Sequence, residues 1–184
     1  MRLEGNLLIN HHNLAQHREL VTSVEGDLFI LAEGAELPLL TSVGGDLDIL
    51  AEGAELPALR SVGGGLTLTG EGAGLASLTF VGGNLGIMSE GADLPALAGV
   101  GGSLYVLARG AGLPALSSVG GDTLVNAEEA GLTALRSVGG NLTVNAGGAG
   151  LRSLRSVGGR LFLGRPAFRI PSLESVGGKP YPGA

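Results

Sequence analysis

The chain has 184 residues, no cysteine and a net charge of −6, with 44% apolar but only 3% aromatic residues. This composition excludes disulfide bonds and thiolate metal ligands within the sequence, and it predicts a core of Leu, Val, Ile and Ala. The first residues contain no apolar run of the length that a signal peptide requires, and no stretch predicts a membrane span. We therefore expect a cytoplasmic protein.

One valine recurs every 19 residues, and all but one of these valines are followed by two glycines. A fixed period of this length is typical of a solenoid, in which each coil buries its apolar side against neighbouring coils. We predict one solenoid domain over 1–184, with a cap and first coil in 1–23, repeats in 24–176 and a proline-containing tail in 177–184. The valines are Val24, Val43, Val62, Val81, Val100, Val119, Val138, Val157 and Val176.

The N-terminal segment predicts a short helical cap over the first coil. Leu7 and Leu28 are separated by 21 residues rather than 19, so this coil contains two additional residues. The sequence from Asn13 to Gln16 fits a capping box, in which Asn13 begins a helix and Gln16 bonds back to it.

Each coil is expected to contain one short strand and a turn. Leu47 and Ile49 alternate with residues that face outward, which predicts a strand with one buried face. The residues 51–55 that follow predict a turn. Strands one period apart would pair in parallel at about 4.8 Å, so nine coils predict a rod about 40 Å long.

The second half of the coil predicts a bent side and a corner. Leu56, Leu59 and Val62 follow one another at intervals of three, and all three are expected to face inward. The Gly63–Gly64 pair predicts a corner that requires either a positive φ or close contact with the next coil.

Ser137–Asn145, with the sequence Ser-Val-Gly-Gly-Asn-Leu-Thr-Val-Asn, resembles the repeats of receptor L-domains and fungal cell-wall glycoproteins of the leucine-rich-repeat type. The resemblance extends over nearly the whole chain. It implies an all-β fold, namely a right-handed parallel β-solenoid of the leucine-rich-repeat type with about nine coils. Unlike those repeats, this chain places Glu rather than Asn in the turn and has no cysteine caps.

One coil departs from the pattern. In Gly121-Asp122-Thr123-Leu124 the usual Leu-Thr order is reversed, so Thr123 falls where other coils bury leucine. We expect a bulge or a poorly filled coil at this position.

The outward position at the middle of each strand differs from coil to coil while the core positions agree. It contains half of the six aromatic residues of the chain. The exposed sheet is the usual interaction face of a solenoid, so we predict that this strand face binds a protein partner. Sequence drift on an unconstrained surface is the alternative. The residues are Phe29, Asp48, Thr67, Gly86, Tyr105, Leu124, Thr143 and Phe162.

Glutamates recur in the turns and predict an acidic ladder along the rod. Neighbouring carboxylates at about 5 Å repel by roughly 0.8 kcal/mol in water, which an exposed turn tolerates. The ladder is either a solvated edge or an acidic stripe that mimics nucleic acid toward a basic partner. It consists of Glu33, Glu52, Glu71, Glu90 and Glu128, with Arg109 between the last two.

No arrangement of residues predicts catalysis, a cofactor or a metal site. The histidines His11, His12 and His17 lie together near the N-terminus, but no tight spacing enforces metal binding, so we expect structural or solvated histidines. The glycine pairs lack the G-x-x-x-x-G-K-[ST] pattern of a phosphate-binding loop. We therefore expect that the protein is not an enzyme and uses no cofactor.

Charge is distributed unevenly along the rod. Residues 1–131 contain four basic and 16 acidic residues, a net charge of −12, whereas the remainder contains seven basic residues and Glu174, a net charge of +6. The acidic body argues against direct nucleic-acid binding. Opposite ends should attract, but Pro180 and Pro182 obstruct strand pairing between molecules, so we expect a monomer at moderate salt and weak head-to-tail association at low salt.

Overall fold

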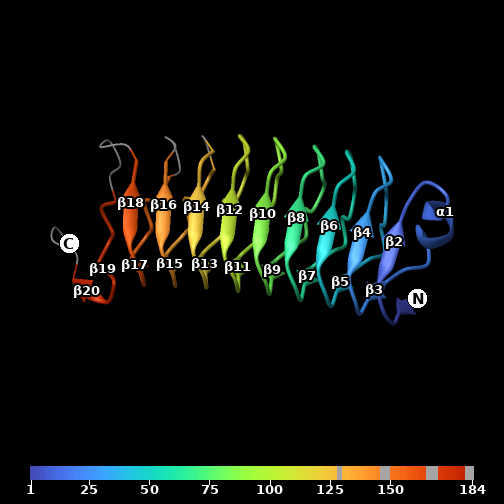
Figure 1. Cartoon of the computed structure of the whole chain (residues 1–184), viewed down its shortest axis with the longest axis horizontal. Coiled ribbons are helices and arrows are strands. Elements are labelled where there is room, and N and C mark those ends of the chain that lie inside the picture. Colours follow the sequence, from blue (N-terminus) through green and yellow to red (C-terminus); the bar gives the residue numbers. More distant parts are fainter. Residues whose placement is uncertain (128–129, 146–149, 165–169, 181–184) are drawn as a thin grey trace.

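The chain forms a parallel β-solenoid of about nine coils, as Figure 1 shows for the computed structural model. The structure describes residues 1–127, 130–145, 150–164 and 170–180, and of Pro180 only the backbone. Within these ranges the only α-helix is α1 (Leu14–His17), at the N-terminal end of the rod. No helix there is long and apolar enough to cross a membrane.

Every regular coil contributes to two sheets. Among the described residues, sheet A has 11 strands and sheet B has nine, and successive coils pair in parallel in both. Sheet A consists of β1 (Arg2–Leu3), β3 (Ser23–Val24), β5 (Ser42–Val43), β7 (Ser61–Val62), β9 (Phe80–Val81), β11 (Gly99–Val100), β13 (Ser118–Val119), β15 (Ser137–Val138), β17 (Ser156–Val157), β19 (Ser175–Val176) and β20 (Lys179–Pro180). Sheet B consists of β2 (Leu7–Ile9), β4 (Leu28–Ile30), β6 (Leu47–Ile49), β8 (Leu66–Leu68), β10 (Leu85–Ile87), β12 (Leu104–Val106), β14 (Thr123–Val125), β16 (Leu142–Val144) and β18 (Leu161–Leu163).

The predicted strand at Leu47–Ile49 is confirmed as β6 of sheet B. The sequence analysis missed the two-residue strands of sheet A, which lie just before the glycine corners. Leu47 and Ile49 are fully buried, and so are Leu56, Leu59 and Val62 from the other sides of the coil. The 19-residue spacing thus places the same apolar positions of successive coils on top of one another, in one continuous core.

Close approach, rather than a positive φ, explains the glycine pairs at the corners. A Cβ built on Gly63 would lie 2.2 Å from the backbone oxygen of Gly44, one coil earlier. The same distance is 2.0–2.3 Å at the equivalent glycines of other coils. Positive φ values occur instead in the turns that contain the glutamates, for example 65° at Gly53.

A row of polar side chains joins the coils beside sheet B, and the sequence analysis missed it. In each case a side-chain oxygen accepts a hydrogen bond from the backbone N–H one coil further on. Asn84 Oδ1, for example, accepts from the N–H of Ser103 at 2.8 Å. We call this row the polar ladder; its accepting residues are Asn6, Asp27, Asp46, Asn84, Ser103, Asp122 and Asn141.

Asn84→Ala should lower the free energy of unfolding by about 1 kcal/mol, because it removes the acceptor of the Ser103 N–H. Asn84→Asp is the matched control, since it keeps an oxygen at the same place, as Asp46 and Asp122 do in their coils. Urea unfolding followed by circular dichroism measures both. An equal loss in the two variants would show that the hydrogen bond does not matter.

The capping box predicted at the N-terminus is wrong. Asn13 precedes α1 but makes no side-chain cap hydrogen bond. Its Nδ2 instead donates to the carbonyl of Leu8 at 2.6 Å, and its Oδ1 accepts from the N–H of Asn10 at 2.9 Å. The backbone groups of successive strand residues point to alternate edges of the strand. The carbonyl of Ile9 accepts a hydrogen bond from the next coil, so the carbonyl of Leu8 and the N–H of Asn10 point to the opposite, outer edge of β2. Asn13 therefore occupies hydrogen-bonding positions that a preceding coil would use, and it protects this edge from another strand.

The C-terminal end of sheet A is closed by a hairpin. Strand β20 pairs antiparallel with β19, whereas the other strand pairs in the described part of the chain are parallel. Gly177 and Gly178, which the sequence presents as another corner, have φ values of 60° and 71° and form the tight turn between these strands. Pro180 lies opposite Ser175 in this reversed strand, and Pro182 lies outside the described residues. The expectation that these prolines obstruct strand pairing between molecules stays a prediction.

Thr123 occupies the leucine position of its coil, as expected, but the predicted bulge is wrong. Thr123 pairs in regular register between Leu104 and Leu142. Threonine is β-branched and adopts extended backbone readily, so the reversal of sequence order does not disturb the strand. Its side chain is 2% exposed, and Oγ1 has no hydrogen-bond partner. The defect is therefore a buried hydroxyl in an otherwise apolar row.

Candidate interaction surfaces

The predicted strand face forms one continuous row along the middle of sheet B. Each of its residues is paired in register with the equivalent residue of the next coil, from Phe29 opposite Asp48 to Thr143 opposite Phe162. Tyr105 and Phe162 are the most exposed members, at 39% and 58%. The structure adds Leu8, which pairs with Phe29 and is 45% exposed. We call this set the variable row.

Tyr105 separates two open hollows on this face. The first has a volume of about 430 Å³ and lies over Asp48, Thr67 and Gly86. The second has a volume of about 480 Å³ and lies over Leu124 and Thr143. Neither hollow is enclosed, so the surface suits an extended partner better than a small molecule.

A second row of exposed side chains lies beside the variable row, one residue beyond the strands. Its members are apolar in the N-terminal half of the rod, and the sequence analysis did not single them out. Their backbone N–H groups all bond to the preceding coil in the same way. We call them the apolar row: Leu31, Leu50, Met88 and Leu107, which are 45–53% exposed, with Thr69 between Leu50 and Met88. The coil position of these residues is readable in the sequence, but their exposure is not.

The predicted acidic ladder borders the apolar row. Glu33, Glu52, Glu71 and Glu90 are all exposed in the turns that follow sheet B. The backbone aligns them, since the N–H of Gly34 donates to the carbonyl of Glu52, and that of Gly53 donates to the carbonyl of Glu71, both at 2.8 Å. Glu128 lies outside the described residues.

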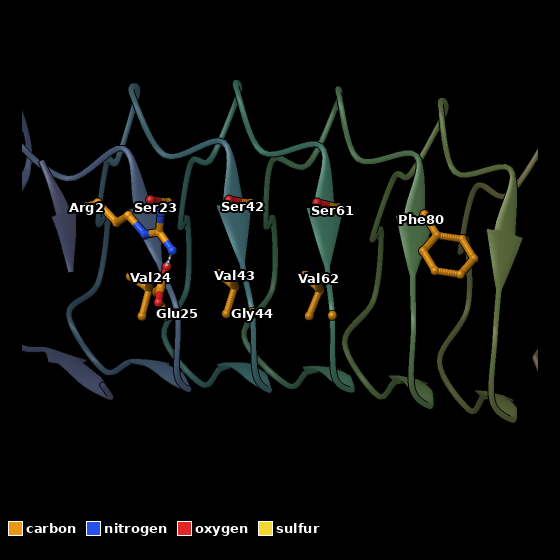
Figure 2. A pocket seen from close by; sticks show the side chains of 11 residues that line it. Arg2, Ser23, Val24, Glu25, Ser42, Val43, Gly44, Ser61, Val62 and Phe80 are labelled. Atoms are coloured by element: carbon orange, nitrogen blue, oxygen red, sulfur yellow. Dashed lines mark ion pairs between the residues drawn. The ribbon is translucent and has the colours of Figure 1, made fainter. Parts of the chain in front are cut away.

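The outer face of sheet A carries a row of serines that is interrupted once. Figure 2 shows Ser23, Ser42 and Ser61 in line, followed by Phe80 in the next coil. A Cβ on Gly99 would lie 3.3 Å from the Phe80 ring, so the ring lies against this glycine and buries it. Phe80 is 47% exposed and stands between two open hollows of about 560 and 550 Å³.

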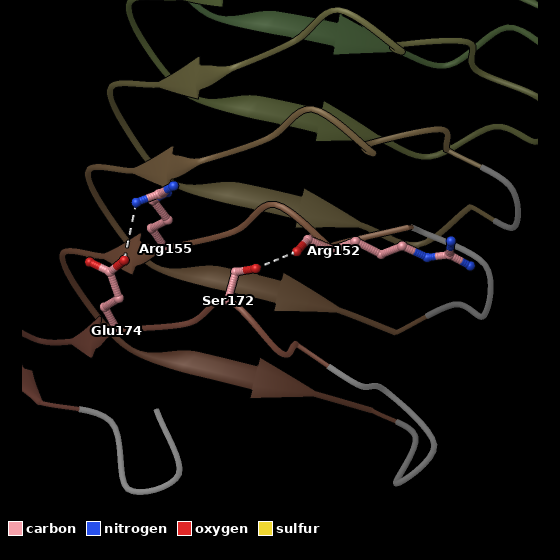
Figure 3. Close-up of polar contacts among 4 residues, drawn as sticks. All are labelled: Arg152, Arg155, Ser172 and Glu174. Carbon is pink, nitrogen blue, oxygen red and sulfur yellow. Dashed lines mark hydrogen bonds and ion pairs between the residues drawn. The ribbon is translucent and has the colours of Figure 1, made fainter.

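The described residues of the basic C-terminal part include an ion pair and hydrogen bonds between coils. Arg155 lies 3.2 Å from Glu174, and the Ser172 hydroxyl donates to the carbonyl of Arg152 at 2.8 Å (Figure 3). Both partners of the ion pair are more than 60% exposed, so the pair contributes little to stability.

Metal-ligand geometry is not found in the part of the chain that the structure describes, where no three His, Asp or Glu side chains gather around one point. Comparisons with protein-family models, with curated proteins and with solved structures find no match to this chain.

Proposed function

We propose that the protein is a non-enzymatic interaction or scaffold module that binds a protein partner through the outer face of sheet B. The observation that carries this proposal is the variable row, in which residues that differ between coils form one line of half-buried and exposed side chains on an otherwise repetitive framework. A uniform core with a changing surface row is what a solenoid needs to recognise one partner along its length. We also propose that the coils are right-handed and of the leucine-rich-repeat type, as residues 137–145 suggest.

The aromatic residues of the variable row are the expected anchors. Aromatic side chains dominate many protein interfaces because they bury a large area at little cost in conformational entropy. Phe29 and Tyr105 are separated by four coils, so a partner that contacts both must follow the rod for about 19 Å.

The triple variant Phe29→Ser, Tyr105→Ser, Phe162→Ser should abolish capture of the cellular partner by the immobilised protein. Phe80→Ser is the matched control, because it removes an exposed aromatic ring from sheet A. Circular dichroism and thermal unfolding check that both variants fold, and mass spectrometry identifies and quantifies the captured protein. Unchanged capture by the triple variant would reject this face.

A second candidate is an acidic inhibitor or nucleic-acid mimic that binds a basic partner through the acidic ladder. It is favoured by the alignment of Glu33, Glu52, Glu71 and Glu90 on one exposed edge. The same capture experiment, repeated at low and at moderate salt, distinguishes the two. Binding through the ladder alone should be lost as salt rises, whereas binding through the variable row should persist.

A further inference from the structure

The apolar row and the acidic ladder lie side by side in the N-terminal half of the rod. Leu31, Leu50 and Met88 each precede a ladder glutamate by two residues. Leu107 is followed instead by Arg109, and the row then continues with Asn126 and Asn145. These two asparagines bond to each other at 2.7 Å and are exposed.

Carboxylates also border the band on its other side. Asp46 belongs to the polar ladder, just before β6, and is exposed. Asp27 lies at the same position one coil earlier, and Asp48 lies in the variable row between them and the apolar row. The N-terminal half of sheet B therefore presents apolar side chains between two borders: the glutamates on one side, and Asp27 and Asp46 on the other side in the first two coils of the band, where Gly65, Asn84 and Ser103 follow at the same position.

The dimensions of this band match an α-helix. Four coil steps from Leu31 to Leu107 measure about 19 Å, which is the length of about 13 helical residues. Asp46 and Leu50 are four residues apart in the sequence, about 13 Å across the sheet, and Glu52 follows Leu50 by two residues. A helix with its side chains is about 10–12 Å wide, so one helix over the apolar row would lie beside the glutamates and could extend long side chains toward Asp46.

Resting on the proposed function, we propose that this band binds a cationic amphipathic helix of the partner protein, with its apolar face on Leu31, Leu50, Met88 and Leu107 and its Lys or Arg side chains toward the two acidic borders. The net charge of −12 over residues 1–131 favours such a partner. The same charge opposes an anionic lipid surface and the acidic body of a second copy, because both would bring like charges together.

The direct test uses a fluorescein-labelled peptide of 16 residues with leucines on one helical face and lysines along both flanks. We expect saturable binding in fluorescence anisotropy and a gain of peptide helicity in circular dichroism. One control peptide has the same composition in scrambled order, and another has Glu in place of every Lys. Equal binding of the scrambled peptide, or no binding of the amphipathic one, would overturn the proposal.

Substitutions on the protein test the location. Replacement of Leu31, Leu50, Met88 and Leu107 together by Ser should weaken peptide binding by at least about tenfold, because it removes the apolar contact area. Leu39→Ser is the matched control, an exposed leucine outside sheet B. Replacement of Glu33, Glu52, Glu71 and Glu90 together by Gln should weaken binding at low salt and reduce its salt dependence.

The outcomes separate this inference from the proposed function. If the peptide does not bind, but the Phe29, Tyr105 and Phe162 variant still loses its cellular partner, the helix is rejected and the interaction face stands. Sedimentation velocity tests whether a second copy of the chain occupies the band instead. If the free protein is a dimer and the apolar-row variant is a monomer, a second copy covers the band and the proposal is overturned.

Discussion

Gly63→Ala should lower the free energy of unfolding by about 3 kcal/mol, the upper end of the usual cost of overpacking. The added Cβ would lie 2.2 Å from the carbonyl oxygen of Gly44, and the backbone atoms there cannot move aside as the end of a side chain could. That carbonyl belongs to the corner of the preceding coil, so the two coils must separate locally. Urea unfolding of the purified variant measures the loss.

Two other glycines, which do not lie at corners, provide matched controls. Gly53→Ala adds a Cβ with no neighbour closer than 3.8 Å, but at a φ of 65°, so we expect a loss of about 1 kcal/mol. Gly86→Ala adds a Cβ whose nearest neighbour is 3.9 Å away on a strand, and we expect almost no change. If all three variants lose the same stability, close approach of the coils is not the reason for the corner glycines.

Thr123→Leu should raise the free energy of unfolding by about 2 kcal/mol. The substitution removes a buried hydroxyl without a partner, a defect that costs about 1–3 kcal/mol, and adds apolar surface to the core. The leucines at the same position in the adjacent coils, Leu104 and Leu142, are fully buried in regular register with it. Thermal and urea unfolding midpoints should both increase.

Thr123→Val separates the two contributions, because it removes the hydroxyl and adds little volume. We expect Thr123→Val to give roughly half of the increase in the free energy of unfolding that Thr123→Leu gives. Thr143→Leu is the control on the same sheet, since Thr143 faces outward in the variable row and its replacement should leave the midpoint nearly unchanged. A lower midpoint for Thr123→Leu would mean that the core around this position is already filled.

The amino-acid sequence by itself determined the solenoid, its coil length and its core. In a parallel ladder with a constant period, residues i and i+19 must lie side by side, so the spacing of Val43 and Val62 also defines their pairing. Alternation then assigns each strand residue to the inside or the outside. For this reason the buried positions, the order of the variable row and the alignment of the acidic ladder could all be predicted without coordinates.

The local structure at Asn13 and at Gly177–Gly178 depends on hydrogen bonds that the local sequence does not specify. Asn13 could have capped a helix, but β2 has an unpaired edge whose carbonyl and N–H groups require partners, and the amide of Asn13 supplies both. Gly177–Gly178 has the sequence of a corner, yet both glycines adopt a positive φ. The chain reverses there, and β20 pairs antiparallel with β19.

On the candidate binding surface, too, the sequence determined some features and the tertiary structure determined others. The sequence placed Phe29, Tyr105 and Phe162 in one row because they share a coil position. It did not show that Leu31, Leu50 and Met88 remain exposed beside them, since a residue just after a strand can turn either toward the core or away from it. The geometry of the turn decides this, and that geometry depends on the stacking of one coil on the next.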